Sequence, residues 1–553
     1  MAESIDRLQA FYGRAGMRHR TLRYFSELSL FAGAFTARPV SSAEQGGATG
    51  ASPLALTWGE PLAARLRSEV RHASDDELAQ ITGTTIHLDV DHRRGRIASG
   101  SALPSVLCES VGQGRRAWST HAVAAAFLAN GTATLHRDAL PEYLATEFVG
   151  GGETLVREAS ALDPATVIEI EPHGCRRRTF ASPRLRWARM PARQARATAQ
   201  ATLGTTLAER AQSGEIWLGL TEGLDSLAVA IALKRRGVAF RAFTWGEPDW
   251  PDAVGARRVA TRLGIDHVLL RPQTPSSSDL YRSFMTQVRG SDGAIRLNPL
   301  ATLAFPEPID EVVTGGGGEI GRAFYYRQTA RNFTRPTSHQ LQRVLSLERA
   351  ITGARPEAMH RVQRSVTAWI DASYEAGATG WRCLDVVYGE QRVRKWGRAM
   401  IPMLPAPTVA AFATADMARA LMSMPLEDRL TSAAQRKLIQ SEFGDEYVQL
   451  RGLQRRGVPP PVRRFSAAVR SRRAARWSPR EWELAGIWQQ LPDVREWLAD
   501  QVLGSSAIVA SMGEAWARTT RDGLLRGMAS DTEMALRAAG PATLDSALDE
   551  LVS

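Results

Sequence analysis

The feature that most constrains the fold is an alternation of apolar strands and helices in the middle of the chain. An apolar strand (EIWLGL, residues 215–220) leads through a short polar loop into an alanine-rich helix. A second strand follows at 240–244, a helix at 252–263 and a third strand at 267–270. Strands and helices that alternate in this way form a parallel sheet with helices on both faces. The chain is therefore predicted to have an α/β fold.

Length predicts two or three domains, and the local pattern places one boundary. The chain has 553 residues, whereas one hydrophobic core rarely organises more than about 250–300. An amphipathic helix predicted at 191–212 separates the alternation from strand patterns nearer the N-terminus. We therefore place a boundary near residue 190, with a first domain at 1–189 and a second at 190–553 that has a helical C-terminal part.

Two patterns predict elements of the first domain. Residues 118–130 predict a helix, and the Thr120 hydroxyl is suited to cap its first turn. Residues 167–170 and 175–180 predict a closing hairpin. This region is therefore expected to mix strands with helices.

Composition argues against membrane, secreted and zinc-binding classes. No apolar run approaches the ~20 residues of a membrane helix, and the N-terminus carries no secretory signal. The three cysteines, Cys108, Cys175 and Cys383, lack CxxC spacing, and their scarcity fits a reducing cytoplasm. The net charge of +11 is mostly arginine. We interpret it as a solvated basic surface and expect no nucleic acid partner; a peptide- or phosphate-facing patch is the alternative.

The strongest local signal is the loop at 220–226 (LTEGLDS), between the first strand and its helix. Backbone N–H groups at such a helix start suit a phosphate chain, and Gly223 allows close approach. Thr221 and Ser226 can donate hydroxyl hydrogen bonds. Phosphate would repel Asp225 unless a metal lay between them, which implies Mg²⁺. Taken alone, the loop fits a polar capping turn without a ligand slightly better.

A second loop favours a ligand site. It follows a strand end at 311–313 and contains four consecutive glycines within TGGGGE, residues 314–319. Glu319 directly after the glycines can share a Mg²⁺ with Asp225. Because the same strand–loop–helix context occurs twice, we favour a ligand site over a flexible glycine loop.

In this order and spacing, the two loops resemble those of the asparagine synthetase family. The family's pyrophosphate loop reads SGGxDS and is matched by 221–226; its second loop reads SGxGxDE and is matched by 314–320. The helix at 252–263 and the segment after it resemble the family's helix ending in "lG..H". Further matches extend the resemblance over roughly residues 190–465, and they lie at Pro402–Pro405, Met424–Pro425 and Lys437–Ile439.

The first 180 residues resemble the family's N-terminal glutaminase domain more faintly. The matches lie at 118–127, at the run to 148–150 and at 162–174. That domain uses a cysteine at position 2 as nucleophile, whereas this chain has Ala2 there and its nearest cysteine is Cys108. The resemblance therefore implies a degenerate Ntn-type αββα domain without glutaminase activity, retained as a relic or as a substrate-docking module.

The resemblance implies that the second domain is an adenine nucleotide α-hydrolase-like (PP-loop) synthetase domain that uses ATP and Mg²⁺. Its reaction would adenylate a carboxylate, release pyrophosphate, and pass the acyl group to an amine with release of AMP. Without internal ammonia, another amine must attack, as in β-lactam synthetases and lasso-peptide cyclases, which also lack the cysteine. The basic surface and long chain favour a peptide. The expected partners are then a ribosomal precursor peptide and its processing protease or recognition protein.

The resemblance also implies site residues. Tyr388 and Glu390 lie where related synthetases place a Tyr/Glu pair near the acyl group, and an exposed helix surface is the alternative. Lys437 is the first candidate for the cation that stabilises the oxyanion, and Arg464 is the second. Asp225 and Glu319 are the metal ligands. The cofactor-binding set is Leu220, Thr221, Gly223, Leu224, Asp225, Ser226, Thr244, Gly315, Gly316 and Gly317.

Several positions depart from the family pattern. Glu222 replaces a loop glycine, Glu319 replaces a metal-binding Asp, and Ile320 replaces an acidic residue. The segment 398–400 lacks the usual Glu-x-Arg. We favour a variant enzyme because Asp225 and the glycines persist. A loop-sharing tRNA-modifying ligase and a scaffold or regulator with a degenerate ATP site remain as alternatives.

Overall fold

The computed structural model describes most of the chain. The described residues are 2–13, 18–25, 30–36, 42–44, 54–58, 84–89, 94–100, 106–171, 173–182, 187–210, 215–271, 276–294, 311–325, 353–396, 408–444, 492–526 and 529–552, with a few isolated positions. The predicted site residue Arg464 and the segments 398–400 and 402–405 lie outside these residues. In the described part, no helix is long and apolar enough to cross a membrane.

The structure contains a five-stranded parallel sheet, which confirms the predicted α/β class. Its order is β14-β13-β12-β15-β16, and every neighbouring pair is parallel. The order reverses between β12 and β15, which are neighbours although distant in sequence. The strands are β12 (Ile216–Gly219), β13 (Phe240–Trp245), β14 (His267–Leu270), β15 (Glu311–Thr314) and β16 (Thr408–Ala410).

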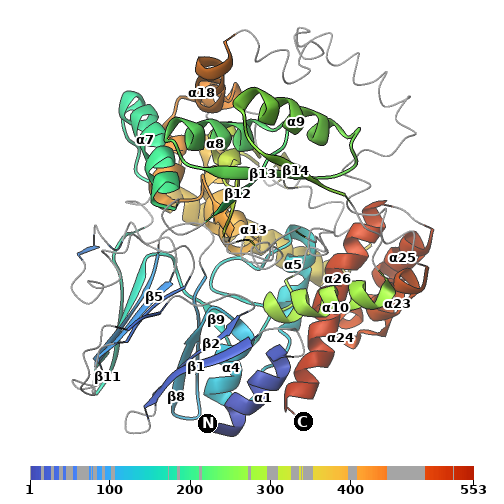
Figure 1. Cartoon of the computed structure of the whole chain (residues 1–553). Helices are drawn as coiled ribbons and strands as arrows, with labels where there is room; N and C mark the ends of the chain where they lie inside the picture. The colour runs from blue at the N-terminus through green and yellow to red at the C-terminus, as the bar shows by residue number, and fades with distance from the viewer. Residues whose placement is uncertain are drawn as a thin grey trace.

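Helices cover the faces of this sheet (Figure 1). The first strand is a continuous buried run, Ile216 to Leu218, as expected for a strand covered on both faces. The helices predicted around it form close to their predicted bounds, as α7 (Ala192–Arg210), α8 (Leu224–Arg235) and α9 (Pro251–Leu263). The later helices near the sheet are α16 (Ala415–Ser423), α17 (Leu426–Leu430) and α18 (Ala433–Phe443).

The N-terminal region is built on antiparallel sheets of six, three and two strands, in the orders β11-β10-β6-β5-β4-β3, β8-β7-β9 and β1-β2. The predicted closing hairpin is confirmed as the β10–β11 pair. The strands are β1 (Arg18–Phe25), β2 (Leu30–Thr36), β3 (Ser42–Glu44), β4 (Leu54–Trp58), β5 (Thr84–Asp89), β6 (Arg94–Ser99), β7 (Cys108–Gly112), β8 (Arg115–Ser119), β9 (Ser160–Ala161), β10 (Thr166–Glu171) and β11 (Gly174–Thr179).

The helix predicted at 118–130 forms as α4 (Ala122–Asn130), but Thr120 does not cap it. The carboxylate of Asp292 accepts hydrogen bonds from the backbone N–H groups of Ala122 (2.7 Å) and Val123 (3.4 Å). Asp292 lies 170 residues from Ala122 in sequence. A carboxylate at the positive end of the helix stabilises it in the way that a local cap would.

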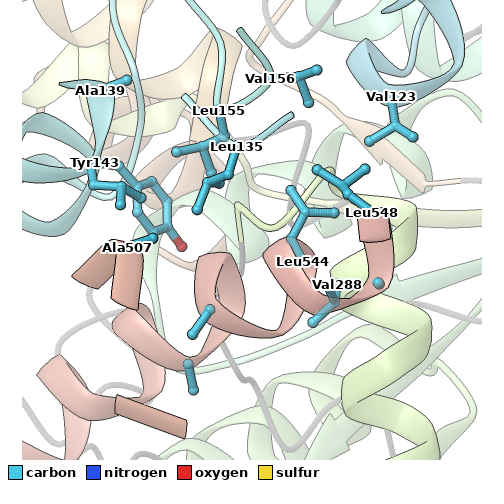
Figure 2. Packing of buried hydrophobic residues seen from close by; sticks show 14 of the residues in the cluster. Val123, Leu135, Ala139, Tyr143, Leu155, Val156, Val288, Ala507, Leu544 and Leu548 are labelled. Atoms are coloured by element: carbon cyan, nitrogen blue, oxygen red, sulfur yellow. The ribbon is translucent and has the colours of Figure 1, made fainter. Parts of the chain in front are cut away.

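One hydrophobic core joins the two ends of the chain. It combines α1 (Ala2–Gly13), α4 and α5 (Leu140–Thr146) with α10 (Ser277–Gly290) and the C-terminal helices. In Figure 2, Leu544 and Leu548 lie near Val123 and Val288. The C-terminal helices are α23 (Pro492–Gly504), α24 (Ser506–Met512), α25 (Glu514–Leu525) and α26 (Ala529–Val552).

This core crosses the boundary expected near residue 190. The last helix, α26, packs against α5 of the N-terminal region, and the Arg7 Nη1 group donates to the Val552 carbonyl (2.7 Å). Parts of both predicted domains are therefore packed around one apolar interior.

The remaining described helices lie along the chain between α4 and α5 or between β15 and β16. The helix α13 (Pro356–Glu375) packs against α14 and, as Figure 1 shows, lies beside α5. The others are η2 (Arg137–Ala139), η4 (Gly318–Arg322), η5 (Gly380–Arg382), α14 (Cys383–Val386) and a π-helical segment, η6 (Val387–Trp396). A π-helical segment is uncommon and often occurs at functional sites.

Candidate functional site

The loop at 220–226 is held in place by its own hydroxyl groups. The Thr221 N–H donates to Ser226 Oγ (3.2 Å), and the Gly223 N–H donates to Thr221 Oγ1 (3.0 Å). The two hydroxyl oxygens lie 3.1 Å apart. Gly223 is the N-cap of α8, and no side chain caps this helix. Thr221 and Ser226 therefore shape the loop, and the backbone at the start of α8 presents the donors suited to an anion.

The glycine loop after β15 packs directly against this helix start. A Cβ atom on Gly315 would lie 2.8 Å from the Asp225 Cβ, and one on Gly318 would lie 2.4 Å from the Asp225 Cγ. Gly317 has a φ of +85°, a conformation that other residues rarely adopt. The glycines are needed because any side chain at these positions would collide with the neighbouring loop.

The structure brings the two predicted metal ligands to one cation, the guanidinium of Arg322. Its Nη2 lies 2.7 Å from Asp225 Oδ2 and 3.3 Å from Glu319 Oε1. All three side chains keep some solvent access. Sequence reasoning did not identify Arg322, which lies in the same short helix as Glu319.

Tyr388 joins this cluster through Glu319. It is buried in the π-helical segment, its ring centroid lies 5.3 Å from those of Phe324 and Tyr325, and its hydroxyl lies near the Glu319 carboxylate. Burial, reinforced by the Glu319 charge, raises the pKa of Tyr388 well above its ordinary value. The phenol is therefore neutral across the physiological range, where it is a hydrogen-bond donor and a poor base.

Glu390 and Lys437 contact other parts of the molecule. The Glu390 carboxylate accepts a hydrogen bond from Trp187 Nε1 (2.6 Å). Lys437 is exposed on α18 and lines a cavity whose described lining contains no residue of 220–226 or 314–319. Of the three catalytic candidates, only Tyr388 has a described contact with a predicted metal ligand.

Thr244 supports the first loop from the neighbouring strand. Its hydroxyl donates to the Leu220 carbonyl (2.6 Å) and lies 2.8 Å from His267 Nε2. Since the hydroxyl proton goes to Leu220, Nε2 carries the proton of the His267 imidazole. Burial, with help from the nearby Arg257, lowers the pKa of His267. Thr244 thus positions the loop and is not free to donate to a ligand.

Arg429 and Gln435 stabilise the second loop through hydrogen bonds to its backbone. The sequence patterns did not reveal either residue. Arg429 is fully buried; it forms a two-pronged pair with Asp385 (Nη1 to Oδ2, 2.8 Å) and donates to the Ile320 carbonyl (Nη2, 2.7 Å). Gln435 Nε2 donates to Asp225 Oδ1 (3.1 Å) and to the Gly318 carbonyl (3.3 Å). These contacts fix the second loop against α14, α17 and α18.

Two of the departures from the family pattern have structural accounts. Glu222 packs its Cβ and Cγ over Gly255 of α9, and its N–H donates to Asp252 (3.2 Å). Ile320 is buried in the apolar cluster beneath the sheet. Ile320 is therefore part of the packing. Cys108, the first cysteine of the chain, is fully buried in β7, where it is not accessible as a nucleophile.

The residues present fit a phosphate ligand with one Mg²⁺. Mg²⁺ commonly binds through one or two carboxylates together with substrate phosphates, and Asp225 and Glu319 already converge on one cation. Among the described residues, no group of three or more His, Cys, Asp or Glu side chains is arranged to hold a metal. A metal here would therefore depend on the phosphates for the rest of its ligands.

Comparisons with known proteins leave the family open. A scan of protein-family models matches none to this chain, and a search of curated proteins returns no match.

Proposed function

We propose that this protein is an ATP-dependent amide-bond ligase that activates a carboxylate by adenylation, with release of pyrophosphate and then AMP. The observation that carries the proposal is the position of the two glycine-containing loops. They follow β12 and β15, at the point where the strand order of the parallel sheet reverses. Ligands of open α/β sheets bind in the crevice at this point, outside the carboxyl ends of the strands.

The residues around this crevice have separate roles in the proposal. The uncapped start of α8 binds the phosphate chain, and Thr221, Ser226 and Thr244 keep the loop in shape. A Mg²⁺ held by Asp225 and Glu319 would stabilise the charge on the leaving pyrophosphate. Tyr388, kept neutral by burial, orients Glu319.

The proposal includes the domain types implied by the sequence. The region around the parallel sheet would be a PP-loop synthetase domain, and the N-terminal antiparallel sheets would be a degenerate Ntn-type domain. The substrate would be a peptide whose Asp or Glu side chain is joined to its own N-terminal amine in the cytoplasm. A β-lactam synthetase-like reaction on a small molecule is the alternative within the same class.

Nucleotide products distinguish this reaction from other uses of ATP. The protein would be incubated with ATP, Mg²⁺ and a panel of carboxylic acids that includes a precursor peptide, and AMP, ADP and pyrophosphate would be quantified. We expect acid-dependent AMP and pyrophosphate, lost in Asp225→Asn but retained in Glu222→Gln, a matched change in the same loop. Formation of ADP and phosphate would contradict adenylation.

A regulator that binds nucleotide without turning it over is the second candidate. It is favoured by Arg322, which already supplies both carboxylates with a cation, and by the buried Ile320. In that case ATP would bind equally well with and without Mg²⁺, and no acid would give AMP. Equilibrium binding of ATP in the presence of EDTA or of Mg²⁺ separates the two candidates.

A further inference from the structure

We propose that a cavity between α7, α8, α16 and α18 is a second binding site, which takes a small amphiphilic anion. The cavity has a volume of about 350 Å³, within the range of roughly 300–1,000 Å³ for small-molecule pockets. The helices α7, α8 and α18 lie on the same side of the parallel sheet (Figure 1). The described lining includes no residue of the two glycine-containing loops, so the proposal does not rest on the nucleotide chemistry. One lining residue, Gln435, contacts both loops through Asp225 and the Gly318 carbonyl.

The interior of this cavity is apolar. Its wall is formed largely by small and apolar side chains that are themselves well buried, and these include Leu203, Ala228, Ala232, Phe412, Met417 and Leu421. Protein interiors are otherwise close-packed, and an unfilled apolar cavity lowers stability in proportion to its volume. An apolar ligand group would regain these contacts.

The rim of the cavity carries an excess of positive charge. Arg196 pairs with Asp428, and Arg235 pairs with Glu442. Arg236 and Lys437 also line the cavity and are exposed, and no carboxylate of the described residues pairs with either of them. The Arg236 guanidinium lies over Gly204 of α7. The rim therefore suits a carboxylate, sulfate or phosphate attached to an apolar body.

Gln435 provides a buried polar group in the lining. Because its Nε2 donates to two acceptors, Asp225 and the Gly318 carbonyl, the orientation of the amide is fixed. Its Oε1 is buried and has no hydrogen-bond partner among the described residues. Leaving a buried acceptor unsatisfied is costly, so a ligand that brings a hydroxyl or N–H donor is favoured over a pure hydrocarbon.

Decanoate and the neutral decanol are suitable probes, with affinity measured on the full chain by isothermal titration calorimetry. We expect decanoate to bind the wild-type protein more tightly than decanol does. Ala232→Phe fills the cavity from α8 and should weaken both probes by more than tenfold. The double variant Arg236→Gln/Lys437→Gln should weaken decanoate by about three- to tenfold and leave decanol unchanged, since each exposed charge contributes a small attraction.

Lys234→Gln is the matched control, because it removes one positive charge from α8 at an exposed position outside the cavity lining. It should bind decanoate like the wild type. Thermal unfolding checks that Ala232→Phe is folded, and the rim variants test the site without altering its interior. The proposal would be overturned if neither probe bound the wild type, or if decanoate bound the wild type and the double variant with equal affinity. Neither result bears on ATP turnover.

Discussion

Two arginine–carboxylate clusters flank the loop after β15, and they differ in their access to water. Arg429 and Asp385 are 0% and 4% exposed, and the guanidinium also binds the Ile320 carbonyl. Arg322 reaches Asp225 and Glu319 with all three side chains between 13% and 29% exposed. We call these the buried cluster and the open cluster.

The difference separates a structural contact from an exchangeable one. In the buried cluster, removing either partner leaves an uncompensated charge in the interior, so the pair is fixed once the protein has folded. In the open cluster, water can replace the guanidinium at either carboxylate, which lowers the cost of breaking the contact. The buried cluster therefore positions the loop, and in the proposed function a metal or a ligand would displace the cation of the open cluster.

The largest expected effect is that of Arg429→Met on stability. The variant strands the Asp385 carboxylate in an apolar region and should lower the free energy of unfolding by about 3–5 kcal/mol. Urea denaturation measures the loss. The double variant Arg429→Met/Asp385→Leu should recover most of it, because no charge then remains buried. Equal stability of the wild type and Arg429→Met would break the distinction between the clusters.

In the open cluster, Arg322→Gln should change metal affinity and leave stability nearly unchanged, unlike Arg429→Met in the buried cluster. This change removes the cation shared by Asp225 and Glu319, so the affinity for Mg²⁺ alone should rise by about fivefold, while unfolding changes by less than about 1 kcal/mol. Calorimetric titration with MgCl₂ measures the first effect, and urea denaturation the second. Arg419→Gln, an arginine whose described contact is the Ala188 carbonyl, is the control. A large loss of stability in Arg322→Gln would show that the open cluster is structural after all.

The Tyr388 hydroxyl sharpens the comparison because it supports one carboxylate of the open cluster. Tyr388→Phe removes the hydroxyl near Glu319 and should weaken Mg²⁺-dependent ATP binding by about two- to tenfold, the range of one hydrogen bond. Its buried ring is retained, so the unfolding midpoint should change little. Because the pKa of Tyr388 is raised, the phenol does not titrate near neutrality. The wild type and Tyr388→Phe should therefore show the same pH dependence of ATP binding there. Unchanged ATP affinity in the variant would show that Glu319 does not need the Tyr388 hydroxyl.

The smallest expected effect concerns His267, which supports the first loop through Thr244. The folded-state pKa is lowered below the ordinary value of 6.5, so the unfolded chain takes up the proton first. Stability is therefore complete above pH 6.5 and falls as the pH drops from there through the folded-state pKa. Thermal melting of the wild type and His267→Gln across this range should show a smaller acid sensitivity in the variant. An identical pH dependence would contradict this account.

The strands and helices of the parallel sheet were predictable because each is encoded by a contiguous stretch of sequence. The first strand is a continuous apolar run from Ile216 to Leu218, and the helices that follow β12 and β13 begin after polar loops, so the elements from Ile216 to Leu270 form close to their predicted bounds. The glycines and acidic residues of the two loops were visible for the same reason. The two loops lie side by side because β12 and β15 are neighbouring strands. A parallel sheet allows this strand order but does not require it.

The supporting residues were not predictable because their partners are distant in sequence. Gln435 lies 210 residues from Asp225, and Asp292 lies 170 residues from the helix it caps. Helical periodicity also does not fix which neighbour a side chain meets. Glu390 accepts a hydrogen bond from Trp187, and Lys437 lies on the rim of the cavity. The packing of the C-terminal helices onto the N-terminal region had no local signal at all.

The most direct test of the central claim is the affinity for ATP of the wild type and of Asp225→Asn, each measured by calorimetry with Mg²⁺ and with EDTA. If the loops after β12 and β15 form a site for ATP and Mg²⁺, the wild type should bind ATP at least tenfold more tightly with Mg²⁺, and Asp225→Asn should lose that difference. Glu222→Gln, in the same loop, should keep it. Failure of the wild type to bind ATP, or a Mg²⁺ effect that survives in Asp225→Asn, would contradict the account.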